Sequence, residues 1–296
     1  MIRAVGIIVL LAVTGCREKP PPRAVAVRED GALELSLCSF NVRYENDGDH
    51  GWRAWPNRID RVVRTIRQLD PDVLGIQEAL HGQAADLRAS LPDYAFHGVG
   101  RDDGDRAGEY AAIFYKADRF EPGEKGTFWL SDFPEQPGSR TWGNSVVRCT
   151  TWIRLIDRAT GRGFYVYNTH WDHRHQPSRE KSARLIAERL ADRRHADEPV
   201  VLLGDFNATE GNPALEHLVG RHTGLVDPYR ILHQGEKNRR TLHFWDGDID
   251  GWAKVDHILV SSSATLEAAG IHHAATRKEQ PSDHYPAWVR ITWPPP

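Results

Sequence analysis

Residues 199–209 read Pro-Val-Val-Leu-Leu-Gly-Asp-Phe-Asn-Ala-Thr, and this stretch decides the fold. Its four consecutive apolar residues, Val200 to Leu203, predict a short strand that is buried on both faces. The strand ends at Gly204-Asp205-Phe206-Asn207, where a glycine leaves room for other groups beside a carboxylate and a carboxamide. Taken alone, a strand followed by an Asx-type turn explains these residues equally well. The rest of the chain favours polar groups held at a rigid strand end.

Three other predicted strands also close on a polar side chain. Residues 33–42 alternate apolar and polar positions and close with Asn41. Residues 73–76 are apolar and are followed by Gln77-Glu78, and residues 164–169 run into His170. The same arrangement therefore recurs at several places along the chain.

The remaining pattern predicts many strands and few helices. Apolar residues at helical spacing predict helices over residues 59–69, 84–91, 182–190 and 214–219. Further strands are predicted over residues 94–99, 109–115, 146–156, 255–260 and 285–293, with 120–132 mixed and a weakly marked strand beginning at Ile271. No linker interrupts residues 31–296, so we expect one α+β domain in which two sheets pack face to face with helices outside.

The charge balance of the chain argues against one class of partner. The sequence has 38 Lys and Arg residues against 41 Asp and Glu residues, a formal net charge of -3. A protein that binds duplex nucleic acid regardless of sequence usually carries a basic excess or a basic stripe. A small phosphorylated substrate remains compatible with this balance.

The first 30 residues have the pattern of a targeting segment. Arg3 precedes an apolar run, and Val13-Thr14-Gly15-Cys16 then resembles a bacterial lipobox. We expect residues 1–16 to be a lipoprotein signal peptide, with Cys16 as the lipidated residue, and residues 17–30 to be an extended tether. This predicts a protein of the bacterial cell envelope, anchored by lipid in the periplasm or at the outer membrane. The alternative is an ordinary signal peptide with an incidental cysteine.

Two other cysteines, Cys38 and Cys149, each lie in an apolar stretch that is typical of a strand. We expect them to be buried free thiols, because two cysteines do not make a disulfide framework. A disulfide between them is the alternative in an oxidising envelope.

The polar residues that follow the predicted strands form a chemically coherent set. Its members are Asn41, Glu78, His170, Asp205, Asn207, Asp256, Asp283 and His284. Carboxylate and carboxamide oxygens suit a hard divalent cation such as Mg²⁺ or Mn²⁺. An imidazole beside a carboxylate suits stabilisation or protonation of a phosphoryl oxygen. One such residue is usually a cap or a surface group, but eight at separate strand ends indicate a site.

In these stretches the sequence resembles the endonuclease/exonuclease/phosphatase superfamily, which has the DNase I-like fold. The matching blocks are Ser39-Phe40-Asn41-Val42, Gly75-Ile76-Gln77-Glu78, Gly108-Glu109-Tyr110, Asn168 to His173, Gly204-Asp205-Phe206-Asn207, Lys254-Val255-Asp256-His257 and Ser282 to Pro286. The resemblance covers residues 33–293 in family-like order. It implies a four-layer α/β/β/α sandwich of two mixed β-sheets with helices outside.

The resemblance also implies a role for each matching residue. Glu78 would be the principal ligand of Mg²⁺ or Mn²⁺, and Asn41 and Asp283 would complete or orient the metal shell. Whether one or two cations act is open.

For catalysis, the resemblance implies that Asp205 orients or deprotonates the attacking water, and that Asn207 holds this water or a phosphate oxygen. His284, oriented by Asp256, would stabilise charge on the scissile phosphate, and His170 would be a second donor to that phosphate. This division assigns charge neutralisation to the imidazoles and cation, and water activation to a carboxylate.

Two further residues are candidates for substrate contact or support. Glu109 lies where relatives often place a glutamate that positions a catalytic histidine, although an ordinary strand glutamate explains it equally well. Arg148 precedes a strand and could bind a phosphate with two donors, although an exposed strand arginine is as good an explanation.

Three functions follow from these observations. The first is a metal-dependent hydrolase that cleaves a phosphoester bond by in-line attack of an activated water. A zinc hydrolase is suggested by the histidines in residues 170–175, but their spacing does not match the usual zinc ligands. A catalytically inactive envelope protein that only binds is the third.

The substrate class stays open between a nucleic acid, a phospholipid head group and a small phosphorylated metabolite, because related cores act on all of them. We expect a monomer whose membrane contact is its lipid anchor. Six tryptophans near the polar strand ends either form an aromatic substrate rim or pack inside the fold, and they are Trp52, Trp55, Trp142, Trp171, Trp245 and Trp252.

Overall fold

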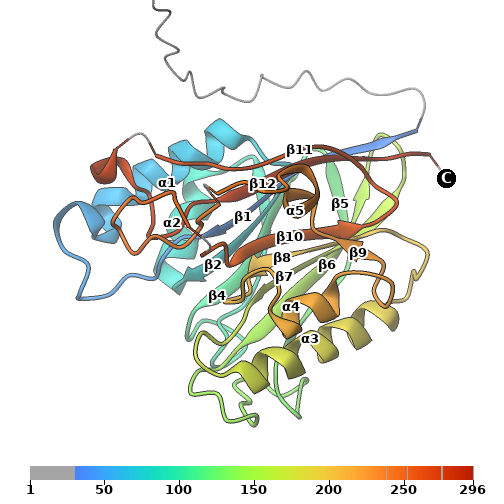
Figure 1. The fold of residues 1–296 in the computed structure, drawn as a ribbon, viewed down its shortest axis with the longest axis horizontal. Coiled ribbons are helices and arrows are strands. Elements are labelled where there is room, and N and C mark those ends of the chain that lie inside the picture. The colour runs from blue at the N-terminus through green and yellow to red at the C-terminus, as the bar shows by residue number, and fades with distance from the viewer. Residues whose placement is uncertain (1–30, 238, 252, 275, 296) are drawn as a thin grey trace, which may run out of the picture.

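Two six-stranded β-sheets pack face to face at the centre of the molecule (Figure 1). The structure is a computed structural model, and it describes residues 31–237, 239–251, 253–274 and 276–295. The predicted signal peptide, lipobox and tether lie outside the described residues, as does Trp252. In the described part of the chain, no helix combines the length and the apolar character that crossing a bilayer requires.

The first sheet has the strand order β11-β12-β1-β2-β4-β3. Within it, β1 and β2 run parallel, and every other neighbouring pair is antiparallel. The strands of this sheet are β1 (Leu33–Asn41), β2 (Val73–Ala79), β3 (Tyr94–His97), β4 (Tyr110–Lys116), β11 (Thr265–Ile271) and β12 (Ala287–Trp293).

The second sheet has the strand order β5-β6-β7-β8-β10-β9. Here β7 and β8 are the parallel pair among antiparallel neighbours. Its strands are β5 (Phe120–Trp129), β6 (Cys149–Asp157), β7 (Gly163–His170), β8 (Val200–Asp205), β9 (Leu225–Val226) and β10 (Asp256–Ser261).

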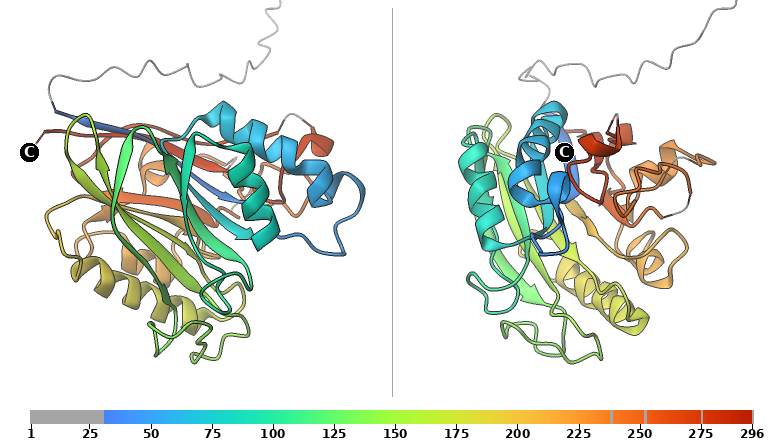
Figure 2. Two further views of the ribbon diagram at one scale, coloured as in Figure 1. Left: turned by 180° about the vertical axis from the view of Figure 1, so that it is seen from behind. Right: turned by 90° about the vertical axis from the view of Figure 1, so that its left-hand side faces the viewer.

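Helices cover the outer face of each sheet. α1 (Trp55–Leu69) and α2 (His81–Ser90) pack on the first sheet, and α3 (Gln176–Ala191) and α4 (Pro213–Leu218) pack on the second. Figure 2 shows these two helical layers on opposite sides of the paired sheets. A short helix α5 (Pro228–Leu232) and 3₁₀ turns at Gly51–Arg53 and Arg277–Glu279 complete the elements. The predicted four-layer sandwich of two mixed sheets is confirmed.

β8 shows why a run of apolar residues was needed at the centre of the second sheet. Side chains alternate between the two faces of a strand. Val201 and Leu203 pack in the core between the sheets, whereas Val200 and Leu202 pack under α3 and α4. All four side chains are therefore buried, as the sequence of this strand predicts.

Several elements were predicted with the wrong bounds, and three of them are instructive. α3 begins at Gln176 rather than near Ser182, because His175 accepts the Ser178 N–H and Pro177 occupies the first turn. Residues 120–129 form a continuous strand with an irregularity between Pro122 and Lys125. β11 ends at Ile271 instead of beginning there, and its weak alternation is interrupted by a register shift between Leu266 and Ala268.

Cys38 and Cys149 are both buried free thiols. Burial raises the pKa of the Cys38 thiol far above its ordinary value and raises that of Cys149 to about 12. Both therefore stay protonated and pack as small apolar side chains.

Gly75 of β2 provides a test of the sheet packing. A Cβ atom there would lie 1.9 Å from Leu203 Cδ1 and 3.0 Å from Asn168 Cγ. Asn168 has little freedom to move, because its amide donates to the carbonyls of Ile76 and Ala112. We expect Gly75→Ala to lower the free energy of unfolding by about 1–3 kcal/mol through overpacking, measured by chemical denaturation.

Gly82, an exposed residue of α2 with nothing within 4 Å of a Cβ, is the matched control. Gly82→Ala should raise the free energy of unfolding by roughly 0.4–1 kcal/mol, because alanine is the better helix former. Equal stability of the two alanine variants would contradict the described packing of the sheets.

Candidate active site

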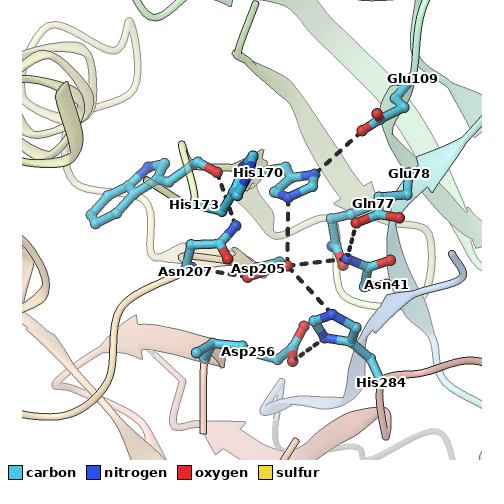
Figure 3. Close-up of polar contacts among 12 residues, drawn as sticks. Asn41, Gln77, Glu78, Glu109, His170, His173, Asp205, Asn207, Asp256 and His284 are labelled. Atoms are coloured by element: carbon cyan, nitrogen blue, oxygen red, sulfur yellow. Dashed lines mark hydrogen bonds and ion pairs between the residues drawn. The ribbon is translucent and has the colours of Figure 1, made fainter. Parts of the chain in front are cut away.

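Each sheet brings the carboxyl end of a parallel strand pair to the same place. β1 and β2 set Asn41 beside Gln77, and β7 and β8 set His170 beside Asp205. β10 places Asp256 opposite Asp205 on the other side of β8. The residues whose side chains or backbone link up there, many of them labelled in Figure 3, are Asn41, Glu78, Glu109, His170, Asp205, Asn207, Asp256 and His284.

Two local backbone features aim the acidic side chains. Position 204, just before Asp205, requires glycine, because a Cβ atom there would lie 2.1 Å from the carbonyl oxygen of Thr169. Glu78 has a φ of 68° and lies where the register of β2 shifts between Gln77 and Ala79. A residue at such an irregularity turns its side chain away from the regular ladder.

Asp205 is the centre of the cluster and is only 1% exposed. Its Oδ2 accepts a hydrogen bond from Asn41 Nδ2 at 3.0 Å and lies 3.5 Å from His170 Nε2 and 3.9 Å from His284 Nε2. Its Oδ1 accepts the backbone N–H of Asn207 at 2.9 Å. Burial, and then the nearby carboxylate of Asp256, raise the pKa of Asp205 to about 7.

His284 is held by a buried carboxylate. Its Nδ1–H donates to Asp256 Oδ2 at 2.9 Å, and Asp256 is fully buried. Burial lowers the pKa of His284, but Asp256, Asp205 and Asp283 outweigh this effect and raise it to about 10. His284 is therefore a cation at neutral pH.

His170 has the opposite electrostatic environment. Its Nδ1 lies 3.7 Å from Glu109 Oε2, and Glu109 is itself bound by both terminal nitrogens of Arg101 at 2.6 and 2.8 Å. Burial, followed by the charges of Arg148 and Arg101, holds the pKa of His170 well below its ordinary value. The site thus pairs a neutral imidazole with a cationic one, as acid–base sites often do.

Arg148 is a buried positive charge beside His170 and is 5% exposed. Its Nη2 lies 3.3 Å from His173 Nδ1 and its Nη1 lies 3.9 Å from Glu109 Oε2. Its Nε and Nη1 have no hydrogen-bond partner among the described residues. Two guanidinium groups, those of Arg101 and Arg148, thus face the single carboxylate of Glu109, which suits an anionic ligand.

The residues around Glu78 fit a hard divalent cation. In the described part of the chain, one side-chain atom each of Glu78, Asp205 and His284 lie within 4.8 Å of one another, and the two carboxylates supply the ligand oxygens because His284 is protonated. Asn41 Nδ2 lies between the two carboxylates, donating to Glu78 Oε1 at 2.9 Å as well as to Asp205. Two carboxylates that converge this closely are the arrangement that a divalent cation stabilises.

Asp283 lies at the margin of this group. Its Oδ2 is 3.7 Å from Arg43 Nη1, and its Oδ1 lies 3.3 Å from Ser282 Oγ. Burial raises its pKa. Its predicted metal role therefore stays a prediction, through water or through its effect on neighbouring groups.

The side-chain amide of Asn207 binds the segment that follows β7. It has a φ of 46°, and its Nδ2 donates to the carbonyl of Trp171 at 3.0 Å, as Figure 3 shows. Its backbone N–H, rather than its side chain, binds Asp205. Its role in holding a water or a phosphate oxygen therefore stays a prediction.

Some supporting contacts carry no local signal in the sequence. Arg101 lies in a turn eight positions before the glutamate that it binds. Gln77, fully buried, donates to Asn168 Oδ1 at 2.8 Å across the two sheets. Such partners become visible only when the strands are placed.

The histidines of residues 170–175 diverge, which disfavours a zinc centre built from them. His170 faces Asp205, His173 faces Arg148 and His175 caps α3. A shared ion needs its ligands around one point.

Three of the tryptophans near the polar strand ends are packing residues. Trp55, Trp171 and Trp245 are 3%, 0% and 4% exposed, so these three pack inside the fold rather than form an aromatic rim. Trp52 and Trp142 are half-buried.

Sequence and structure comparisons agree with the fold. A family model described as the endonuclease/exonuclease/phosphatase family matches residues 38–284. The chain belongs to this family.

Two solved structures of family members resemble the chain over almost their whole length. An endonuclease/exonuclease/phosphatase from Bacteroides vulgatus is 35% identical with a TM-score of 0.82, covering 88% of this chain and 98% of that one. A mannosyl-6-phosphatase from Bacteroides thetaiotaomicron is 32% identical with a TM-score of 0.79, covering 87% and 99%.

Among curated proteins, Nocturnin of Drosophila melanogaster is 28% identical over 204 residues, which are 64% of this chain and 30% of Nocturnin. The chain spans between 30% and 62% of the length of the curated relatives that it matches.

The Asp256–His284 pair predicts an unusual titration. In cation-free protein, His284 should stay protonated well above its ordinary pKa of 6.5, and Asp256→Asn should lower its pKa by removing the carboxylate that it binds. NMR titration of the imidazole Cε1 proton measures both values. The exposed carboxylate of Glu135, replaced in Glu135→Gln, is the control that should leave His284 unchanged.

The raised pKa of His284 also makes the stability of the folded chain depend on pH. Because the pKa of His284 in the folded chain is about 10 and its ordinary value is 6.5, its contribution to stability is complete below pH 6.5. That contribution is lost as the pH rises from 6.5 to 10. A wild-type His284 that titrates near 6.5 would contradict the pairing.

Proposed function

We propose that the chain is a divalent-metal-dependent hydrolase that cleaves a phosphoester bond by in-line attack of a water molecule. Hydrolysis of phosphoester substrates is the chemistry of its family. The observation that carries the proposal is the convergence of Asp205, His170 and His284 beside Glu78. These side chains come from both sheets and surround one point.

Asp205 is suited to accept a proton from the attacking water. A general base works best when its pKa lies near the working pH, and the pKa of Asp205 is raised to about 7. The backbone N–H of Asn207 holds the other carboxylate oxygen, so the accepting oxygen keeps its direction. His170 Nε2, 3.5 Å from the accepting oxygen, orients it further.

The phosphoryl group would meet positive charge on several sides. His284 is protonated and buried, so it stabilises negative charge more strongly than an exposed imidazole would. Arg148, with two nitrogens free of hydrogen bonds among the described residues, supplies further donors. When bound at Glu78, with Asn41, Asp205 and His284 nearby, Mg²⁺ or Mn²⁺ would neutralise developing charge on the phosphoryl oxygens.

For the substrate we propose a small phosphorylated metabolite, with a sugar monophosphate as the leading class. The support is the 32% identity to the mannosyl-6-phosphatase over almost its whole length. The formal net charge of -3 also gives a polyanion no general attraction. Nucleic acids and phospholipid head groups are the competing outcomes of the substrate test.

We also propose that the protein acts as a monomer in the bacterial cell envelope, attached to a membrane by lipid at Cys16. The support is the lipobox-like sequence at residues 13–16 and the Pro-rich stretch that follows it.

The catalytic proposal predicts the effect of two substitutions. Asp205→Asn and His284→Ala should each lower kcat about 10²–10⁴-fold, because each removes a group that acts on the water or on the phosphate. Turnover is measured on mannose 6-phosphate, nitrophenyl phosphate, bis-nitrophenyl phosphate, single-stranded DNA, RNA and a phospholipid. Asp60→Asn, an exposed change on α1, is the control that keeps wild-type turnover.

The same set of substrates tests the metal requirement and the substrate class. EDTA should abolish turnover, and Mg²⁺ or Mn²⁺ should restore it. Faster turnover of monoesters than of diesters supports the metabolite class. Full activity in EDTA, or wild-type turnover by Asp205→Asn, would contradict the mechanism.

The envelope proposal predicts that Cys16→Ser moves the protein from the membrane fraction to a soluble fraction, because the acyl anchor needs the cysteine. Fractionation with labelled palmitate follows the change. A wild-type chain that takes up no label and never sediments with membranes would count against lipid anchoring.

A further inference from the structure

Arg58, a residue of α1 outside the catalytic group, is completely buried. Its guanidinium lies 4.9 Å from the Trp55 ring and 5.7 Å from the Trp245 ring. Burial lowers its pKa to about 10, so it remains charged at neutral pH. A buried charge normally has a carboxylate partner.

Arg58 instead binds four backbone carbonyls. Its Nε donates to Arg53 at 2.9 Å, and its Nη2 donates to Arg43 at 2.5 Å. Its Nη1 donates to Val42 at 2.5 Å and to Pro281 at 3.1 Å. One planar group thus joins the exit of β1 to a segment more than 220 residues later.

The hydrogen bonds of Arg58 to the carbonyls of Val42 and Arg43 hold the backbone next to Asn41. Val42 and Arg43 directly follow Asn41, and Arg43 has a φ of 57°, which is costly for a residue other than glycine. In this conformation the Arg43 N–H donates to Asn41 Oδ1 at 3.0 Å. The Asn41 Nδ2 is thereby turned toward Glu78 and Asp205.

The hydrogen bond of Arg58 to the carbonyl of Pro281 holds the backbone on the opposite side of the site. Pro281 immediately precedes Ser282-Asp283-His284. The Ser282 hydroxyl donates to the Asn41 carbonyl at 2.7 Å, in parallel with the link through Arg58. The two links together set the separation between the Asn41 and Glu78 side and the Asp283 and His284 side.

We infer that Arg58 is a positioning residue that holds the two halves of the proposed cation site together through the carbonyls of Val42, Arg43 and Pro281. Lysine at this position would keep the charge, but its single nitrogen lacks the planar fork that reaches both segments. The inference rests on the proposed function for its cation readout and on geometry alone for its second readout.

The test compares Arg58→Lys, Ser282→Ala and a control, Arg119→Lys. Arg119 also ties distant segments together, through Asp72, Asp157 and the Glu34 carbonyl, but it lies by the start of β1, about 23 Å along the strand from Asn41. Affinity for Mn²⁺ alone is measured by electron paramagnetic resonance. Hydrogen exchange of residues 42–46 and 281–286 is measured in cation-free protein, and unfolding midpoints are recorded for all variants.

We expect Arg58→Lys and Ser282→Ala to weaken Mn²⁺ affinity, by about 10–100-fold for Arg58→Lys, and to speed exchange in both segments. Arg119→Lys should lower the unfolding midpoint without either effect. Wild-type Mn²⁺ affinity and exchange in Arg58→Lys would overturn the inference, and so would a loss of global stability alone.

Two further outcomes separate the hypotheses. If the wild-type chain binds no Mn²⁺, the proposed function fails, and the exchange measurement still decides the positioning role. If Arg58→Lys does not fold, Ser282→Ala decides it, and unchanged exchange of residues 42–46 in that variant overturns the inference.

Discussion

The site depends on the hydrogen bonds and charge contacts of one buried carboxylate, that of Asp205. A carboxylate that is 1% exposed must find hydrogen bonds or opposite charge inside the protein. It finds Asn41 from the first sheet, His170 from the neighbouring strand and His284 from the segment before β12. Because these groups come from both sheets, the arrangement of the site's side chains depends on how the two sheets pack. The core between the sheets therefore determines the catalytic distances.

The fold could be predicted because its main signals are local. Four apolar residues in a row identify β8, and the polar residues that end β1, β2, β7 and β8 all lie at the carboxyl ends of parallel pairs. The carboxyl ends of parallel neighbours lie at the same edge of a sheet, so the polar residues gather there. The roles given to Asn207 and Asp283 by resemblance remain predictions, since the structure places both nearby without assigning their ligands.

The remaining features depend on partners that are distant in the sequence. Arg58 reads as an ordinary helical arginine, yet its acceptors include a carbonyl 223 positions away. The bounds of β11 depend on its pairing with β12, because strand formation reflects neighbouring strands more than the strand's own residues. Arg101 likewise binds Glu109, whose carboxylate lies beside His170, so this distant contact is part of the electrostatic environment of the imidazole. Charges and hydrogen bonds between distant segments are what the sequence pattern cannot supply.

The most direct test of the central claim is anomalous diffraction from crystals grown with Mn²⁺ and inorganic phosphate. The account predicts a manganese peak within ligand distance of Glu78, about 2.0–2.2 Å, with a phosphate between that peak and the imidazoles of His170 and His284. A site without manganese beside Glu78, or a structure in which Glu78, Asp205 and His284 lie in separate regions, would contradict it.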